Sequence, residues 1–186
     1  MKRLVAFILL AVLLCGCAGQ DGQMDRVLAL RAKLLQGKGC SFDAVITADY
    51  GDQVQTFTLG CQADDKGTVS FEVCAPESIA GITGRIDAEG GKLTFDDQLL
   101  VFGLLADDQL SPVSSPWVFI KALRGGYITA CGRDGDYLMA SIDDSYDDDA
   151  LQLDIWLDGD DVPIRAEILW KSRRFLSMEV KNFRIV

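Results

Sequence analysis

Cysteine, aspartate and glutamate are the residue types that could do chemistry in this chain, because it contains no histidine. Its 186 residues include six cysteines and 28 acidic side chains. Without histidine there can be no Ser-His-Asp or Cys-His nucleophile, no histidine-ligated metal and no histidine general base. A carboxylate pair remains chemically possible, but no nucleophile motif accompanies the acids. The composition therefore predicts a protein that is not an enzyme and that uses no cofactor.

Eight of the 28 acidic residues lie in two runs, 143–149 and 158–161. Runs of this kind between strands are usually solvated loops. Neither run places a glutamate at the position that closes a calcium loop, so we expect no metal site there. Glu72 and Glu77 are the only carboxylates near a dense apolar region, and neither has an evident partner. The sequence therefore gives little support to a hydrolase.

Four cysteines lie in the body of the chain: Cys40, Cys61, Cys74 and Cys131. An even number favours disulfides in an oxidising compartment, and four cysteines allow three connectivities. Cys40 and Cys61 flank two strand-like runs that turn at Gly51-Asp52, so we prefer Cys40–Cys61 with Cys74–Cys131. The absence of a C-x-x-C motif argues against redox chemistry, and the spacings lack the close pairs of a zinc site. Free buried thiols remain the alternative.

The beginning of the chain has the layout of a signal peptide. Lys2 and Arg3 precede an apolar run, residues 4–14, which is too short to span a bilayer as a helix. The ending Leu14-Cys15-Gly16-Cys17 resembles a bacterial lipoprotein signal. That resemblance implies that residues 1–16 are removed and that Cys17 carries a diacylglycerol, with palmitate among its acyl chains. A plain secreted protein or a short anchor helix is the alternative.

The charge of the mature chain bears on its partners. Removal of residues 1–16 takes away two of the 18 basic residues and no acidic one, so the net charge changes from −10 to −12. Such an acidic protein is not expected to bind nucleic acid or to dock electrostatically on anionic lipid. We therefore expect membrane attachment through the lipid on Cys17. An extended tether over residues 17–23 would reach at most about 20 Å.

Residues 24–186 have the length of a single domain. An apolar stripe interrupted by Arg31 predicts a helix over Met24–Gln36, and a second helix is expected over Ser115–Leu123. Period-two alternation starts at Phe42 and returns through 57–61 and 69–73. Shorter strands are expected near 84–87 and 92–95, and an antiparallel meander over 137–142, 151–157, 163–171 and 175–185. The predicted class is α+β, with one long antiparallel sheet backed by helices.

This order of elements resembles the LolA/LolB superfamily of lipoprotein carriers and receptors. The resemblance rests on the signal ending in Cys17, the leading helix, the Ala75-Pro76 loop and Leu110-Ser111-Pro112 before a Trp-bearing helix that ends in Leu123-Arg124-Gly125. It also rests on the closing pattern Pro163-x-x-Ala166-Glu167-Ile168 with Asn182-Phe183-x-Ile185. The resemblance implies an unclosed β-barrel, covered by two or more helices, whose concave apolar face holds acyl chains.

The resemblance also assigns candidate residues. The side chains expected to line a lipid cavity are Phe42, Ile46, Phe57, Leu59, Phe71, Val73, Phe95 and Trp117. The alternative is that they form a filled core, which is the usual meaning of an alternating apolar face. Ile79, and after it Ile82, is the counterpart of the family's exposed apolar residue in a membrane or cargo loop. These two isoleucines could instead pack under the rim of the sheet.

Two functional hypotheses follow from the sequence. The first is a membrane-anchored lipoprotein that binds acyl chains or lipoproteins without covalent chemistry. The alternative is a lipid-tethered interaction module that positions or activates an envelope or spore-cortex enzyme. The partners are then the membrane, a lipid or lipoprotein cargo, or an envelope enzyme. Both hypotheses place the protein outside the cytoplasm, on the cell membrane or, in a host with two membranes, on the outer membrane.

Overall fold

The computed structural model describes residues 18–49, 54–95, 98–102, 105–106, 109–147 and 150–186. The expected signal peptide and Cys17 lie outside these ranges. Eleven strands form one antiparallel sheet in the order β6-β5-β4-β3-β2-β1-β13-β12-β11-β10-β9. The outermost strands β6 and β9 each pair with one neighbour, so the sheet is unclosed. With the helices described below, this agrees with the predicted α+β class.

The strands follow the chain in two groups. The first group is β1 (Gly39–Asp49), β2 (Val54–Asp64), β3 (Val69–Ala75), β4 (Thr83–Asp87), β5 (Gly90–Phe95) and β6 (Gln98–Phe102). The second is β9 (Tyr127–Asp134), β10 (Tyr137–Asp143), β11 (Leu151–Leu157), β12 (Pro163–Trp170) and β13 (Arg173–Ile185). A separate two-stranded ladder joins β7 (Leu105–Ala106) to β8 (Gln109–Leu110). The last strand, β13, lies between β1 and β12 and joins the two groups.

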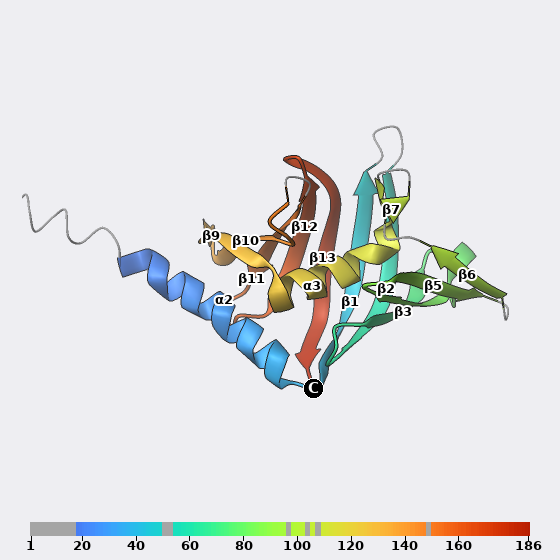
Figure 1. The fold of residues 1–186 in the computed structure, drawn as a ribbon, viewed down its shortest axis with the longest axis horizontal. Helices are drawn as coiled ribbons and strands as arrows, with labels where there is room; N and C mark the ends of the chain where they lie inside the picture. The colour runs from blue at the N-terminus through green and yellow to red at the C-terminus, as the bar shows by residue number, and fades with distance from the viewer. Residues whose placement is uncertain (1–17, 50–53, 96–97, 103–104, 107–108, 148–149) are drawn as a thin grey trace, which may run out of the picture.

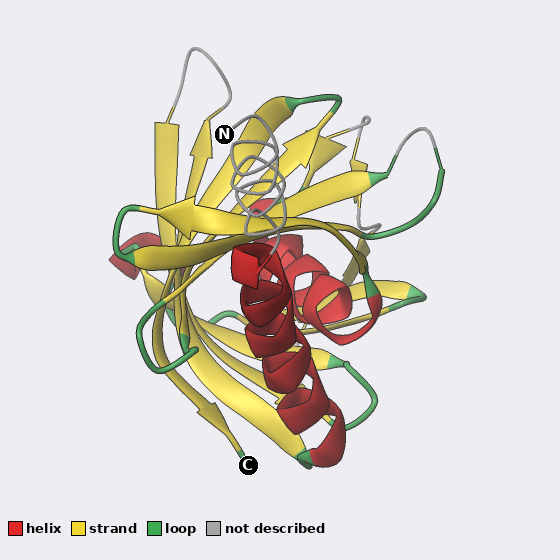
Figure 2. Cartoon of the chain, turned by 90° about the vertical axis from the view of Figure 1, so that its left-hand side faces the viewer, coloured by secondary structure: helices red, strands yellow, loops and turns green. Residues whose placement is uncertain are grey.

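Two α-helices of the described residues lie on one side of this sheet, and the strands curve around them (Figures 1 and 2). The helices are α2 (Ala18–Gln36) and α3 (Ser115–Gly125). A short 3-10 turn, η1 (Glu77–Ile79), follows β3, and another, η2 (Pro112–Ser114), precedes α3. We call the face of the sheet that meets the helices the inner face, and the opposite face the outer face.

Period-two alternation decides which side chains form the core. On β1, every second residue from Phe42 to Ala48 is buried, and the residues between them are half-buried. Leu59 and Cys61 on β2, and Phe71 on β3, continue the same face because they pair in register with β1 and with each other. The strands of the second group supply the rest of one continuous core. The four strands of the predicted meander are present as β10, β11, β12 and β13.

Helix α3 is buried over almost its whole length. Ser115 to Ile120, Ala122 and Leu123 are all buried, as expected of a helix with apolar residues on every side. Pro116 lies in its first turn, where the missing backbone N–H has no partner in any case. The observed span agrees with the predicted one to within two residues.

Helix α2 begins earlier than the sequence predicted. It starts at Ala18 and not near Met24, so the expected extended tether is helical in this structure. Residues 18–23 contain no proline, and extending an existing helix costs far less than starting one. The helix contacts α3 and β9. Val27, Leu30 and Leu34 belong to the core, and Met24 packs against it. In the part of the chain that is described, no helix is long and apolar enough to cross a membrane.

Candidate functional site

The predicted cavity residues lie together on the inner face. Phe42, Ile46, Leu59, Phe71 and Val73 are each at most 4% exposed and belong to the main core. Phe57 lies opposite Ile46 on the same face and is half-buried. Trp117 reaches the core from α3. Phe95 ends β5, and its side chain lies outside the described residues.

Helix α3 fills the concave face at its centre. Phe119 stacks edge-on against Phe42 of β1, with ring centroids 5.4 Å apart, and both rings contact Phe183 of β13. Small side chains on the inner face, such as Ala44 and Ala140, leave room for the helices to approach the strands. The spacing of small and bulky residues that suggested a cavity therefore serves helix packing in this structure.

Two arginines join the ends of the helices to each other. Arg31 of α2 donates hydrogen bonds to the carbonyl oxygens of Leu123 (2.7 Å), Ala122 (3.3 Å) and Gly126 (2.8 Å). Arg124 of α3 donates in return to Leu34 O (3.1 Å), near the end of α2, and to Asp65 O (2.6 Å) in the β2–β3 turn. Partial burial lowers the pKa of Arg31 below its ordinary value. Each arginine satisfies carbonyls at the negative end of the other helix.

An opening of about 960 Å³ lies beside α3, and we call it the mouth. Its apolar wall consists of Trp117 and Val118, which are also core residues, together with Leu151. The rest of its lining is polar and comes mainly from the ends of α3 and the turns β2–β3, β4–β5 and β10–β11: Lys66, Gly67, Thr68, Asp87, Ala88, Glu89, Lys121, Arg124, Gly125, Asp144, Ser145 and Asp147. Lys121 pairs with Asp144 at 2.8 Å across it.

The loop after β3 is folded against the body of the protein. Ile79 and Ile82, the candidate membrane or cargo residues, are half-buried and pack on the core. The loop is held by hydrogen bonds from Val73 N–H to Ile82 O (2.8 Å) and from Gly81 N–H to Val73 O (2.9 Å). The structure thus places these isoleucines under the rim of the sheet, and their role in contact with membrane or cargo stays a prediction.

The predicted disulfides are not formed, and all four cysteines are free thiols. Cys40 pairs with Ala63 and Cys61 with Phe42, so the two cysteines are diagonal neighbours on adjacent strands. Such neighbours are about 7–8 Å apart, beyond the usual reach of a disulfide. Cys131 is buried on β9, where its sulfur lies 4.0 Å from that of Met24, whereas Cys74 is exposed on β3. The pairing Cys74–Cys131 is therefore wrong as well.

Burial makes three of these thiols poor nucleophiles. Desolvation raises the pKa of Cys40 to about 11 and raises the pKa of Cys61 still further. The same cause raises the pKa of Cys131. Since the thiolate is the reactive form, these side chains behave as small core residues.

The acidic runs form ordinary turns in the parts that are described. Asp144 accepts a hydrogen bond from Leu151 N–H at 2.8 Å, and Asp158 accepts from Asp160 and Val162 N–H, each at 2.9 Å. Among the described residues, no three histidine, cysteine, aspartate or glutamate side chains lie close enough together to hold a metal ion.

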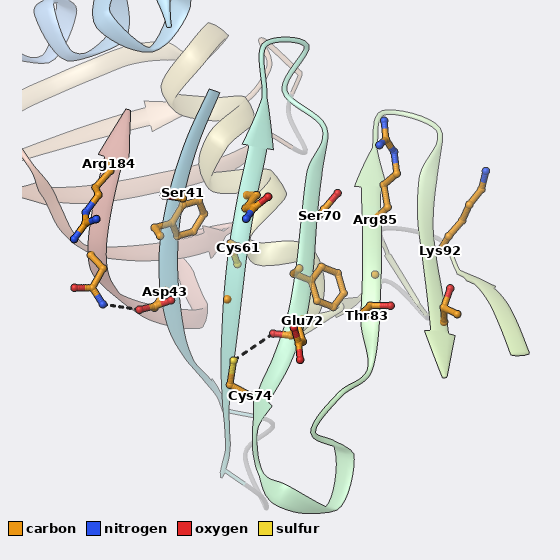
Figure 3. A pocket seen from close by; sticks show the side chains of 17 residues that line it. Ser41, Asp43, Cys61, Ser70, Glu72, Cys74, Thr83, Arg85, Lys92 and Arg184 are labelled. Carbon is orange, nitrogen blue, oxygen red and sulfur yellow. Dashed lines mark hydrogen bonds between the residues drawn. The ribbon is translucent and has the colours of Figure 1, made fainter. Parts of the chain in front are cut away.

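A second hollow, of about 980 Å³, lies on the outer face of β1–β5 and the end of β13 (Figure 3). We call it the outer groove. The lining residues are Ser41, Phe42, Asp43, Gly60, Cys61, Gln62, Ser70, Phe71, Glu72, Cys74, Thr83, Gly84, Arg85, Lys92, Thr94, Asn182 and Arg184. Asn182 donates to the Asp43 carboxylate at 2.6 Å, and Arg85 lies 3.8 Å from Asp64. The groove is not predicted from the sequence, although its polar residues alternate with the core residues of the same strands.

Several solved structures are similar in fold to this chain. A conserved protein of Thermus thermophilus has 14% identity and a TM-score of 0.48, with coverage of 88% of this chain and 87% of that one. A LolA superfamily protein of Nitrosomonas europaea has 8% identity and a TM-score of 0.44, with 86% and 93% covered. The Mycobacterium tuberculosis lipoprotein LppX has 12% identity and a TM-score of 0.42, with 87% and 93% covered. The similarity concerns fold alone.

Comparison by sequence adds no relative. No family model matches the chain, and no curated protein matches it.

Proposed function

We propose that this protein is a bacterial lipoprotein, held outside the cytoplasm by lipid on Cys17, that binds acyl chains non-enzymatically between α3 and the inner face. The observation that carries the proposal is the mouth. Trp117 and Val118 belong both to its wall and to the buried core, so an apolar ligand in the mouth would lie directly against core side chains. Its volume of about 960 Å³ lies within the usual range of roughly 300–1,000 Å³ for ligand pockets.

Binding of a long chain requires α3 to move, because its side chains occupy the centre of the inner face. The movement must break the hydrogen bonds that Arg31 and Arg124 make at the helix ends. The N-terminal end of α3 is preceded by η2 and the short β7–β8 ladder, but its C-terminal end is joined by Gly126 directly to β9, so a shift of the whole helix also displaces that edge strand. Ile79 and Ile82 then remain candidates for contact with the cargo or the membrane.

The second candidate is a lipid-tethered module that positions or activates an envelope or spore-cortex enzyme. The observation that favours it is the filled inner face, in which Phe119 of α3 packs on Phe42 and Phe183. In this case the anchor and outer surfaces would carry the function, and no acyl chain would enter.

Native mass spectrometry on the exported Cys17→Ala protein separates these candidates. The acyl-binding proposal expects a co-purifying or added fatty acid at near one per molecule. Trp117 can report the location of this ligand in a protein whose other two tryptophans, Trp156 and Trp170, are replaced by phenylalanine. Its fluorescence should change on titration with palmitate. A matched protein that retains only Trp156, which lies on β11 under Arg165, should not respond.

A blocking variant sharpens the test. Gly125 lines the mouth, and a Cβ at this position would have no atom within 4 Å. Gly125→Phe should therefore fold normally and reduce palmitate binding at least tenfold. Gly132→Phe, on β9 with equally open space, is the control and should bind as the parent protein does. No uptake of lipid by the folded parent protein would favour the tethered module.

A further inference from the structure

The outer groove lies on the opposite face of the sheet from the mouth and has a different character. It is formed by six consecutive strands of the sheet, β13, β1, β2, β3, β4 and β5. None of them is an edge strand, because β5 still has β6 beside it. Adjacent strands are about 4.8 Å apart, so these six strands extend the groove over roughly 24 Å. A groove of this length suits a linear ligand of several units.

The register aligns the lining residues in two rows across the strands. In one row Ser41 pairs with Gln62 and Gln62 with Ser70. In the other, Glu72 pairs with Thr83 and Thr83 with Thr94. Hydroxyl and amide groups both donate and accept hydrogen bonds, and they recur here at the strand spacing. Figure 3 shows Ser41, Ser70, Glu72 and Thr83 of these rows along the hollow.

The charged residues of the groove have a definite arrangement. Arg184 on β13 and Arg85 and Lys92 on β4 and β5 stand toward its two ends. The carboxylates of Asp43 and Glu72 lie between them. Within the described part of the chain, the Glu72 carboxylate has no hydrogen-bond or ion-pair partner. Two central carboxylates are strong acceptors for hydroxyl donors and repel anions.

Gly60 makes the hollow possible. Gly60 pairs with Asp43 on one side and with Glu72 on the other, and so continues the second row. Any other residue at this position would place a side chain in the groove. A Cβ at Gly60 would lie 3.7 Å from the sulfur of Cys74, which is ordinary contact. The position therefore tolerates a side chain sterically, and its absence leaves the groove open at the centre.

We propose that the outer groove is a binding site for a neutral, hydroxyl-rich oligosaccharide. An apolar ligand would leave its many polar groups without partners, at a cost. A polyanion would meet the central carboxylates on a protein of net charge −10. A peptide cannot add a strand there, because the backbone groups of these strands are used by their neighbours. Sugar hydroxyls match the alternating donors and acceptors. This inference does not depend on acyl binding.

The test uses the exported Cys17→Ala protein and an array of neutral and anionic oligosaccharides, followed by calorimetry on those that bind. Neutral linear saccharides of three or more units should bind. Gly60→Leu, which fills the centre of the groove, should weaken binding at least tenfold. Gly132→Leu places the same side chain on β9 of the same face, away from the groove, and should leave affinity within twofold.

A second variant guards against misfolding of Gly60→Leu. Glu72→Ala removes an exposed carboxylate and should reduce affinity about tenfold with no change in thermal stability. Absence of binding by every neutral saccharide overturns the proposal. So does equal binding by the parent protein and folded Gly60→Leu, or binding confined to anionic saccharides. Selection of a peptide in a parallel peptide array, without any saccharide, would assign the groove to a protein partner and also overturn it.

Discussion

The cysteines illustrate how residue-scale environment decides chemistry. Cys40, Cys61 and Cys131 are buried, whereas Cys74 is exposed and lines the outer groove. Their even number, in a chain expected in an oxidising compartment, predicts disulfides. Pairing depends on register, however, and a shift of two residues between neighbouring strands is enough to separate two sulfurs.

We predict that one thiol of the Cys17→Ala protein reacts quickly with a water-soluble thiol reagent at pH 8. That thiol is Cys74, because it is exposed, while burial and a raised pKa protect the other three. The measurement is the number of modified cysteines by mass spectrometry before and after unfolding in urea. Cys74→Ser is the control and should show no fast phase. Isolation of the native protein with no reactive thiol even after unfolding would contradict this assignment.

Stability should also depend on pH through Cys40. Its pKa is about 11 in the folded protein and about 8.5 in an unfolded chain. The folded state therefore holds this proton more tightly, and the stabilisation is complete below pH 8.5 and is lost as pH rises toward 11. The urea concentration at the midpoint of unfolding should decrease as the pH is raised from 8 to 10.5. Cys40→Ala should lose less over that interval, and an equal loss would exclude this cause.

At the scale of elements, the two helices form a unit through their C-terminal ends. Arg31 and Arg124 each donate to carbonyl oxygens of the other helix, and Arg124 also holds the β2–β3 turn. The sequence showed Arg31 only as an interruption of an apolar stripe. Long guanidinium side chains suit this task because several N–H donors share one plane.

Arg31→Leu should lower the free energy of unfolding by about 2 kcal/mol, since hydrogen bonds from a charged group contribute roughly 1.5–3 kcal/mol. Arg31→Lys should recover only part of this, because one ammonium group cannot reach all three carbonyls. Urea unfolding measures both changes. Lys33→Leu, exposed on the same helix, is the control and should be near neutral. If acyl binding requires α3 to move, Arg31→Leu should also speed palmitate uptake.

The strength of the local pattern explains which elements could be predicted. Strands such as β1 and β11 have an uninterrupted apolar alternation, and α3 is bounded by Pro116 and Gly125-Gly126. Strand β9 was missed because only Cys131 is buried in it. The outer groove was missed because it depends on pairing between strands far apart in sequence, as with Ser41 and Arg184. Inner-face residues could be found, but whether a helix fills the space could not.

For the whole molecule, the early start of α2 bears on attachment to a membrane. The helix begins at the residue after Cys17, so a lipid at Cys17 would be joined to an ordered element with little slack. We predict that Cys17→Ala moves the protein from the membrane fraction to the soluble extracytoplasmic fraction. Cell fractionation and labelling with an alkyne fatty acid measure this change. Cys15→Ala is the control and should retain both the fatty-acid label and the location in the membrane fraction. Retention of an unlabelled Cys17→Ala protein in membranes would contradict lipid anchoring.

The central place of β13 has a consequence for how the protein is made. Strand β13 is the last in chain order, yet it joins β1 to β12 and so connects both halves of the sheet. Until it is available, a nascent or newly exported chain has two separate ribbons, each with an exposed edge that can pair with another chain. The halves can form early from local hairpins, whereas the pairing of Cys40 with Ile185 closes a loop almost as long as the domain. A nascent chain thus depends on its final strand, and proteolytic loss of that strand would leave two fragments of a sheet.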